Sequence, residues 1–222
     1  MFMIIVTGAA GHLGQSVLRK LAAEGHEVAA VDLAGTVPDV GQATSLTGID
    51  LNDVAATTAA FTTLTSSGRV TGLVNLAGGF RWETVGDGSV DSWDLLYRMN
   101  LRSAVNAIRA ILPALRSGGG VIVNVAAQAA IRAASGMGAY AASKAGVMRL
   151  TESLAAEEMD RGVRVNAVMP SIIDTPVNRA DMPDADFDRW VAPDALADVV
   201  AFLISDAARA ITGACIPVTG RS

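Results

Sequence analysis

The sequence contains few of the residues that disulfide, metal or nucleic-acid chemistry needs. It has one cysteine, Cys215, and two histidines, His12 and His26, so neither a disulfide framework nor a zinc cluster has enough ligands. Its 17 Lys and Arg against 22 Asp and Glu give a net charge of -5, and no basic stripe is present to meet phosphates. We therefore expect no metal, no nucleic acid, and a small-molecule partner.

Long apolar runs are also absent. No segment approaches the roughly 18 continuous apolar residues that a membrane span needs, which predicts no membrane partner. The opening "MFMIIVTGAAG" has no basic start and reaches glycine early, so it predicts a buried strand and not a signal peptide. With 51% hydrophobic and 18% charged residues, the composition is that of a globular protein, which we expect in the cytoplasm.

What the sequence does have is a regular alternation of two patterns. Apolar, β-branched segments predict strands at 3–6, 27–32, 48–50, 71–76, 121–125, 164–169 and 214–218. Between them lie segments of helical periodicity, including 91–116, 138–160 and one that begins at Pro193. This alternation predicts one doubly wound, Rossmann-type α/β domain over residues 1–222, with a parallel seven-stranded sheet between two layers of helices.

Three glycines lie between the first predicted strand and the first helix, in "IIVTGAAGHLGQSVLRKL". In a dinucleotide-binding turn, Gly8 would allow the tight turn, Gly11 the approach of a pyrophosphate, and Gly14 close helix packing. The helix N-terminus would attract the phosphates. The plain alternative is that the glycines serve only the geometry of the turn. The predicted contacts with the cofactor in this turn are Gly8, Ala10, Gly11, His12, Leu13 and Gly14.

An acidic residue follows the second predicted strand. Asp32 comes 18 residues after Gly14, where a carboxylate accepts hydrogen bonds from ribose hydroxyls and repels a 2′-phosphate. "VDLAG" supplies no Arg or Lys, so NAD(H) is favoured and NADP(H) is not excluded. The alternative is a solvated acid at a strand end. Asp50 and Leu51, after the third predicted strand, are expected at the adenine ring.

A tyrosine and a lysine share one helix face in "GAYAASKAG". Tyr140 and Lys144 stand at i and i+4, one turn apart. A phenol titrates near pH 10 in water, and a nearby ammonium favours the phenolate, so Lys144 is expected to lower the pKa of Tyr140. The same ammonium can hold a ribose. The alternative is an ordinary helix with a packed tyrosine and an exposed lysine.

These motifs together resemble the short-chain dehydrogenase/reductase family over nearly the full chain. "TGAAGHLG" resembles its phosphate turn, with the glycine spacing of the extended branch, and "VNLAGG" resembles its N-A-G stretch. "YAASK" matches its Y-x-x-x-K, and "MPSIIDTP" resembles its P-G-x-x-x-T segment, with Ser171 where glycine is usual. "RMNLRS" carries Asn100 at the family's helix asparagine, and "ITGACIPVTG" resembles its closing strand.

The resemblance implies roles for further residues. Asn100 would relay protons through water to Lys144 and, with Tyr140, complete the catalytic group. Cofactor contacts are implied for Asn75, Ala77, Gly78, Pro170, Ile173 and Thr175, in addition to Tyr140 and Lys144. Relatives pair through two helices, and helices 91–116 and 138–160 are apolar on more faces than one sheet covers. A homodimer or homotetramer through these helices is expected.

One family residue is missing. The serine that hydrogen-bonds the substrate oxygen stands 13 positions before the tyrosine, and here that position is Ala127. Alanine neither donates nor accepts a hydrogen bond. Three explanations stay open: Gln128 or Ser135 reaches in, catalysis has been lost, or the substrate needs only one acid.

Within the family, the chain most resembles the quinoid dihydropteridine reductases, which also have alanine there. The resemblance rests on "GMGAY", "AGGF" and "DTPVNRADMPDADFDRW". It implies an NADH-dependent reductase of a planar, conjugated substrate, with Tyr140 as the proton donor. The residues expected to bind that substrate are Phe80, Trp82, Ala127, Gln128 and Trp190. The plain alternative is that the aromatic residues only cap the open edge of the core.

Two rival functions remain. One is a reductase of ordinary ketones such as a 3-oxoacyl thioester, against which the absent serine argues. The other is a non-catalytic dinucleotide sensor, which has no need to keep Asn100, Tyr140 and Lys144.

Overall fold

The structure, a computed structural model, describes residues 3–40 and 43–221. Its centre is one sheet of seven strands in the order β3-β2-β1-β4-β5-β6-β7, and every neighbouring pair is parallel. The strands are β1 (Met3–Thr7), β2 (Glu27–Val31), β3 (Ala43–Leu46), β4 (Val70–Asn75), β5 (Gly120–Val125), β6 (Val163–Pro170) and β7 (Cys215–Val218). The expected seven-stranded parallel sheet is confirmed.

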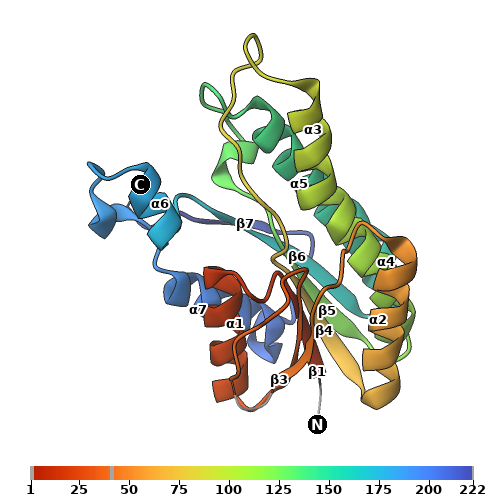
Figure 1. The fold of residues 1–222 in the computed structure, drawn as a ribbon. Helices are drawn as coiled ribbons and strands as arrows, with labels where there is room; N and C mark the ends of the chain where they lie inside the picture. Colours follow the sequence, from red (N-terminus) through yellow and green to blue (C-terminus); the bar gives the residue numbers. More distant parts are fainter. Residues whose placement is uncertain (1–2, 41–42, 222) are drawn as a thin grey trace.

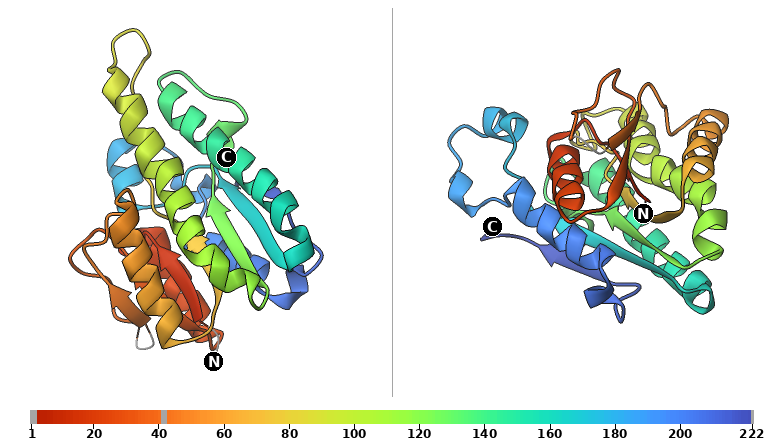
Figure 2. Two further views of the ribbon diagram at one scale, coloured as in Figure 1. Left: turned by 90° about the vertical axis from the view of Figure 1, so that its right-hand side faces the viewer. Right: turned by 90° about the horizontal axis from the view of Figure 1, so that it is seen from below.

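Helices cover both faces of the sheet, as Figures 1 and 2 show. One face carries α1 (His12–Ala23) and α7 (Pro193–Ile204), and the other carries α2 (Val54–Ser67), α4 (Ser103–Arg116) and α5 (Gly138–Glu158). Each layer has its own core: Leu18 and Val200 pack on the first face, Phe61 and Ile111 on the second. The doubly wound arrangement is therefore built from two hydrophobic layers that share the sheet.

The strand sequences are continuously apolar because both faces are covered. In β1, Ile4, Ile5 and Val6 are all buried. Ile4 and Val6 join the core under α1 and α7, whereas Met3 and Ile5 join the core under α2 and α4. This period of two is the pleat of the strand, which sends successive side chains to opposite faces.

The third strand lies earlier than predicted. β3 is Ala43–Leu46, and residues 48–50 belong to no strand; the chain bends at Gly48, whose φ is +69°. Ile49 N–H still donates to the Asp32 carbonyl at 3.0 Å, so the segment stays beside the end of β2. The prediction failed because β3 is an edge strand, in which Thr44 and Ser45 are exposed and no apolar run is needed.

The predicted helix over 91–116 is interrupted. The structure has α3 (Val90–Tyr97), then η1 (Arg98–Arg102), a π-helical turn, then α4. In this turn Ser103 N–H donates to the Arg98 carbonyl, five residues back. The predicted helix over 138–160 is α5, which ends at Glu158 and continues as the 3-10 turn η3 (Met159–Arg161). The predicted start of α7 at Pro193 is confirmed.

The carboxyl ends of the strands share one edge of the sheet. Helices α3 and α5 rise beyond this edge on one side, and α6 (Pro176–Asp181) lies on the other, as Figure 1 shows. The order of the strands reverses between β1 and β4, which is where ligands bind in open α/β sheets. The segments that follow β1, β4, β5 and β6 therefore meet at the expected position of a site.

Candidate active site

Two of the three glycines after β1 are required by close contacts. Gly8 has a φ of +66°, and a Cβ there would lie 2.6 Å from the backbone nitrogen of Ala77, which follows β4. A Cβ on Gly14 would lie 2.3 Å from the Gly8 carbonyl oxygen. The turn after β1 is thus packed directly against α1 and against the segment after β4, with no room for side chains.

Gly11 differs from these two because its surroundings are open. A Cβ there would meet only the Gly8 carbonyl oxygen, at 3.4 Å, an ordinary contact. Gly11 is also the N-cap of α1 and provides no side chain to accept from the first turn. The N–H groups at the start of a helix have no partners within the helix, and the helix dipole favours an anion there. This turn, with His12 and Leu13, therefore fits a pyrophosphate.

Asp32 is held by the same turn. Its Oδ2 accepts from Ala10 N–H at 2.9 Å, and its Oδ1 accepts from Ala34 N–H at 2.8 Å. Each carboxylate oxygen keeps a further lone pair, so the group can still accept from ribose hydroxyls. Leu33, beside it, is 66% exposed and uncharged. The structure thus brings Asp32 to the phosphate turn, as the sequence predicted.

Asp50 and Leu51 lie beyond β3, next to α4. Asp50 Oδ1 accepts from Asn52 N–H at 2.8 Å, and the Leu51 carbonyl accepts from Asn106 Nδ2 at 2.8 Å. These bonds fix the segment to α4 and leave the Asp50 carboxylate exposed. A role for the two residues at an adenine ring stays a prediction.

Lys144 is deeply buried at the carboxyl end of β5. It is 6% exposed, and its Nζ donates to the Val125 carbonyl at 2.8 Å. An ammonium has three donors, so two remain for a ligand. The alternative of an exposed lysine is therefore wrong: the side chain points from α5 toward the edge of the sheet.

Tyr140 is one turn earlier on α5, and its hydroxyl is available. Among the described residues no hydrogen bond to this hydroxyl is found. The oxygen is not fully enclosed either. In the described part of the chain, one fully buried side-chain oxygen lacks a hydrogen-bond partner, and it is Asn52 Oδ1, not the Tyr140 hydroxyl. The Tyr140 ring meets Phe80 almost at right angles, at 84°, with 5.0 Å between ring centroids.

Burial governs the ionisation of both groups. It raises the pKa of Tyr140 to about 12 and lowers the pKa of Lys144 to about 8. The expectation that Lys144 lowers the pKa of Tyr140 is thus wrong for this structure, because burial, which disfavours the charged phenolate, is the cause of the shift. At neutral pH the phenol holds its proton.

Asn100 is placed by the π-helical turn and joins three segments. Its Oδ1 accepts from Gly79 N–H at 2.8 Å, and its Nδ2 donates to the Gly79 carbonyl at 3.1 Å and to Ser143 Oγ at 2.9 Å. A Cβ on Gly78 would lie 2.5 Å from Asn100 Oδ1 and 3.5 Å from Lys144 Nζ. Asn100 and Lys144 therefore lie beside the glycines after β4, and Tyr140 contacts Phe80, which follows them.

Asn75, at the end of β4, lies below this group within the sheet. Its Nδ2 donates to Asn124 Oδ1 at 2.9 Å, and its Oδ1 accepts from Thr7 Oγ1 at 3.4 Å. Ala77 N–H in turn donates to Thr7 Oγ1 at 3.4 Å. Asn75 thus supports the site from beneath, whereas Ala77 and Gly78 are at its floor.

The residues after β5 offer no substitute for the missing serine hydroxyl. Ala127 is 4% exposed, and Gln128 begins the 3-10 turn η2 (Gln128–Ala130) with an exposed side chain. Ser135 is also exposed, and its carbonyl accepts from Trp82 Nε1 at 3.0 Å. Within the described part of the chain, neither side chain hydrogen-bonds to Tyr140.

The segment after β6 flanks the site on the other side. Pro170 ends β6, Ile173 forms a bridge with Val191, and Thr175 Oγ1 caps α6 by accepting from Asn178 N–H at 3.2 Å. Ser171 Oγ donates to the Thr219 carbonyl at 2.9 Å, so it ties β6 to the chain after β7. Contacts of Pro170, Ile173 and Thr175 with a nicotinamide stay predictions.

Trp190 packs inside this segment and is not part of an exposed surface. It is 8% exposed and packs on Phe187, with 4.8 Å between ring centroids. Arg179 lies 4.6 Å above the Phe187 ring and forms a bidentate ion pair with Asp174. The aromatic pair is therefore the core of a small subassembly around α6, and its contact with a substrate stays a prediction.

Sequence reasoning missed two contributors. Ser143 accepts from Asn100 and donates to the Tyr140 carbonyl at 2.7 Å, so it links the two residues. The signal was its place inside "YAASK", three residues after Tyr140, where a helical serine bonds back to the preceding turn. Gly136, with a φ of +76°, was also missed; a Cβ there would lie 2.1 Å from Trp82 Cε2.

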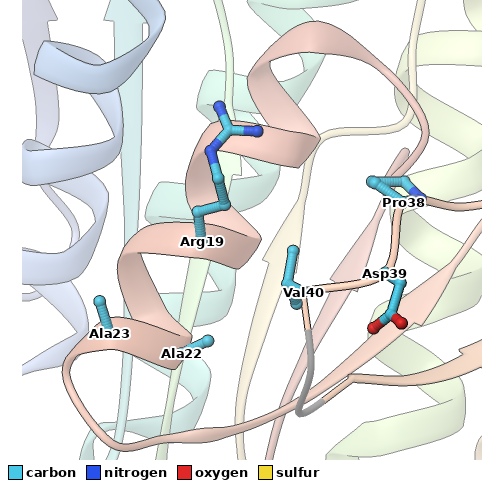
Figure 3. A pocket seen from close by; sticks show the side chains of 6 residues that line it. All are labelled: Arg19, Ala22, Ala23, Pro38, Asp39 and Val40. Atoms are coloured by element: carbon cyan, nitrogen blue, oxygen red, sulfur yellow. The ribbon is translucent and has the colours of Figure 1, made fainter.

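A surface cavity of about 450 Å³ lies apart from these residues. It is lined by Arg19, Ala22, Ala23, Pro38, Asp39 and Val40. Figure 3 shows α1 on one side of it and the segment after β2 on the other. None of the predicted site residues lines it, so we assign it no role.

Neither a metal-binding cluster nor a membrane-spanning helix is found in residues 3–40 and 43–221. There, no group of three or more His, Cys, Asp or Glu could hold a metal ion. No helix in the same ranges is long and apolar enough to span a membrane.

The fold and the site together define a Rossmann-type oxidoreductase. A family model described as "short chain dehydrogenase" matches residues 3–186. The chain therefore belongs to the short-chain dehydrogenase/reductase family, whose dehydrogenases use NAD(P)(H). A solved oxidoreductase of this family from Burkholderia thailandensis is 31% identical, with a TM-score of 0.86, covering 98% of this chain and 91% of the other.

Curated relatives are dehydrogenases of several hydroxy compounds. A D-threitol dehydrogenase from Mycolicibacterium smegmatis is 35% identical, covering 97% of this chain and 90% of the relative. A (3R)-3-hydroxyacyl-CoA dehydrogenase from Rattus norvegicus is 32% identical, covering 98% and 95%. These relatives support an enzyme, and they do not show the specific resemblance to quinoid dihydropteridine reductases.

Proposed function

We propose that the chain is an NADH-preferring reductase that reduces a small, planar, conjugated substrate such as quinoid dihydropterin, with Tyr140 as the proton donor. One observation carries the proposal. The unpaired Tyr140 hydroxyl lies on the same helix face as Lys144, and Ala127, at the position of the family serine, has no hydroxyl to hydrogen-bond a substrate oxygen.

The chemistry divides between cofactor and protein. When bound, the nicotinamide cofactor supplies the hydride. Reduction also needs a proton, and Tyr140 holds one at neutral pH because its pKa is about 12. The Lys144 ammonium stabilises the phenolate as the proton leaves, and its two remaining donors bind the ribose hydroxyls. Asn100, which fixes the glycines after β4, feeds the proton relay to Lys144.

At neutral pH the Tyr140 phenol is in the protonated state that reduction needs, although the raised pKa also makes it a weaker acid. A phenol that stays protonated is ready to donate, whereas oxidation of an alcohol needs the phenolate as a base. The phenolate is scarce at neutral pH in a site that raises the pKa. The substrate class follows from the missing hydroxyl: an electron-poor conjugated ring needs less polarisation of one carbonyl oxygen than an isolated ketone does.

A ketone reductase is the second candidate. The named relatives favour it, because D-threitol and 3-hydroxyacyl-CoA are alcohols whose oxidation gives ketones. Its difficulty is Ala127, which leaves Tyr140 as the single hydrogen-bond donor to a carbonyl oxygen.

NADH is proposed over NADPH because of Asp32. The carboxylate accepts from two ribose hydroxyls but repels a 2′-phosphate, and exposed Leu33 adds no cation. We further propose that the protein acts in the cytoplasm as a homodimer or homotetramer through α4 and α5, with the face of α3 included.

The test measures oxidation of NADH by absorbance, with quinoid dihydropterin and separately with an acetoacetyl thioester. Turnover of the pterin with a higher kcat/KM supports the proposal. Preferred turnover of the thioester replaces it with the ketone reductase. Binding of NADH without turnover of either compound favours the non-catalytic sensor.

The Tyr140→Phe variant then tests the proton donor. It should lose at least about 100-fold in kcat, the usual worth of a general acid, while NADH binding is kept. Full turnover by this variant would exclude Tyr140 from the role.

A further inference from the structure

We propose that Phe80 determines the substrate class of this site, because its open ring face is the surface on which a flat conjugated substrate stacks beside the Tyr140 hydroxyl. The proposal rests on the function proposed above and adds the residue that selects the substrate. It separates Phe80 from Trp82, which the sequence predicted alike.

The position of the Phe80 ring is the first argument. Its centroid lies 5.0 Å from that of Tyr140, and the planes meet at 84°, a favourable perpendicular contact. Phe80 is nevertheless 53% exposed. Part of the ring therefore contacts the Tyr140 ring, while about half of the residue remains exposed.

The backbone next to Phe80 is fixed at Gly79, whose N–H and carbonyl groups are both hydrogen-bonded. Asn100 accepts from Gly79 N–H and donates to the Gly79 carbonyl, so a single amide side chain holds this residue twice. A Cβ on Gly79 would lie 2.4 Å from Met99 Cε, so the segment also packs tightly against η1. Phe80 is thus held in place before any ligand arrives, which lowers the entropy lost on stacking.

Trp82 has a different use. Its Nε1 donates to the Ser135 carbonyl at 3.0 Å, and its ring occupies the space that a Cβ on Gly136 would need. Next to it, Glu83 N–H donates to the Gly136 carbonyl at 2.8 Å. Trp82 therefore joins the segment after β4 to the segment before α5. Although it is 59% exposed, its Nε1–H is already used, and among the described residues the ring contact with Tyr140 belongs to Phe80.

The chemistry of the site indicates that Phe80 orients the substrate. A serine at position 127 would orient a substrate through its oxygen, but Ala127 is buried and cannot hydrogen-bond. Orientation must come from another contact close to Tyr140. A flat ring stacked on Phe80 presents one face to the cofactor and one edge to the phenol, whereas an aliphatic chain gains little from an aromatic face.

The experiment compares Phe80→Leu with a matched control, Phe202→Leu. Phe202 lies on α7 and is 44% exposed, so the control makes the same change at a similar exposure far from Tyr140. For each protein, kcat/KM is measured with quinoid dihydropterin and with an acetoacetyl thioester. The dissociation constant of NADH checks that the cofactor site is intact.

Phe80→Leu should lower the pterin-to-thioester ratio of kcat/KM about five- to tenfold, mainly through KM. This is the contribution expected of one stacked aromatic pair. Phe202→Leu should leave the ratio within about twofold. Phe80→Tyr, which keeps the ring face, should restore the native ratio. An unchanged ratio in Phe80→Leu, with NADH binding intact, overturns the proposal.

A second measurement keeps the test independent of turnover. Calorimetry follows the binding of pterin, a stable aromatic ring, to the protein in the presence of NAD+. If the native protein turns over neither substrate, the proposed function fails, yet weaker pterin binding by Phe80→Leu than by Phe202→Leu still supports the role of Phe80. Equal binding by both variants, or no binding by the native protein, overturns it.

Discussion

At the scale of single residues, Lys144 occupies a position that costs stability. Lys144 is almost fully buried, with one backbone carbonyl as its hydrogen-bond partner. Burial lowers its pKa from 10.5 to about 8. Below pH 8 the folded protein must keep a cation away from water, and stability rises as the pH goes from 8 to 10.5, because there the unfolded chain binds the proton and the folded one does not.

Lys144→Met should therefore stabilise the protein at neutral pH. The shift corresponds to about 3 kcal/mol at 1.36 kcal/mol per pKa unit, and losing the bond to Val125 offsets about 1 kcal/mol of it. We expect a net gain of about 2 kcal/mol at pH 7 that shrinks toward pH 10, measured by urea denaturation. Arg149→Met, an exposed change on the same helix, is the control. A variant less stable than the native protein at pH 7 would contradict the account.

Cofactor choice is also a property of single residues. The Asp32 carboxylate supports the glycine turn through Ala10, so replacing it with alanine would disturb the turn as well. Asp32→Asn keeps one acceptor oxygen and removes the charge, and Leu33→Arg adds a cation at an exposed position. The double variant should raise the NADPH-to-NADH ratio of kcat/KM at least about tenfold, or 1.4 kcal/mol.

Kinetics with both cofactors measure this ratio. Val54→Arg, which adds a cation at another exposed position, is the control and should change nothing. An unaltered ratio in the double variant would show that Asp32 does not discriminate between the cofactors.

At the scale of elements, α5 is fixed to the sheet by a buried polar chain. Thr7, Asn75, Asn124 and Thr151 follow one another across β1, β4, β5 and α5, and all are 5% exposed or less. Thr151 Oγ1 accepts from Asn124 Nδ2 at 2.9 Å. Because Thr151 is two turns after Lys144, this bond helps to set the position of α5 and of the proposed catalytic residues on it.

Thr151→Val removes the acceptor and leaves the Asn124 amide without its partner. The expected loss of stability is about 1–3 kcal/mol, the cost of an unsatisfied buried donor. Thermal or urea denaturation measures it. Thr58→Val is the matched control, because Thr58 is exposed on α2 and its hydroxyl bonds back to the Val54 carbonyl of the same helix. Equal effects of the two substitutions would mean that the buried chain adds nothing.

Elements also differ in how well the sequence predicts them. The glycine turn, Asp32 and the Tyr140–Lys144 pair depend on local spacing. The structure joins Asp32 to the glycine turn and places Tyr140 and Lys144 one turn apart on α5. The π-helical turn at Asn100 was not predictable, because it is held by contacts with Gly79 and Ser143, which are distant in the chain. The raised pKa of Tyr140 was missed for a related reason, since burial depends on tertiary packing.

At the scale of the whole molecule, the outer face of α4 and α5 is the expected contact between copies. Ala156 is exposed on α5, opposite the sheet. If these helices pair, Ala156→Lys places a long charged chain in a packed interface and should shift the protein toward monomer. Ala59→Lys, an equally small exposed residue on α2, is the control. Light scattering coupled to size-exclusion chromatography measures the mass, and an unchanged oligomer in Ala156→Lys would place the interface elsewhere.

The proposed reaction requires that the sheet edge bring a reduced nicotinamide to the phenol of Tyr140. A crystal structure of the protein with NADH tests this most directly. We expect the phosphates at the start of α1, the ribose on Lys144 Nζ, and the nicotinamide ring beside the Tyr140 hydroxyl. A nicotinamide ring bound elsewhere, or a Tyr140 hydroxyl closed off from it, would contradict the account.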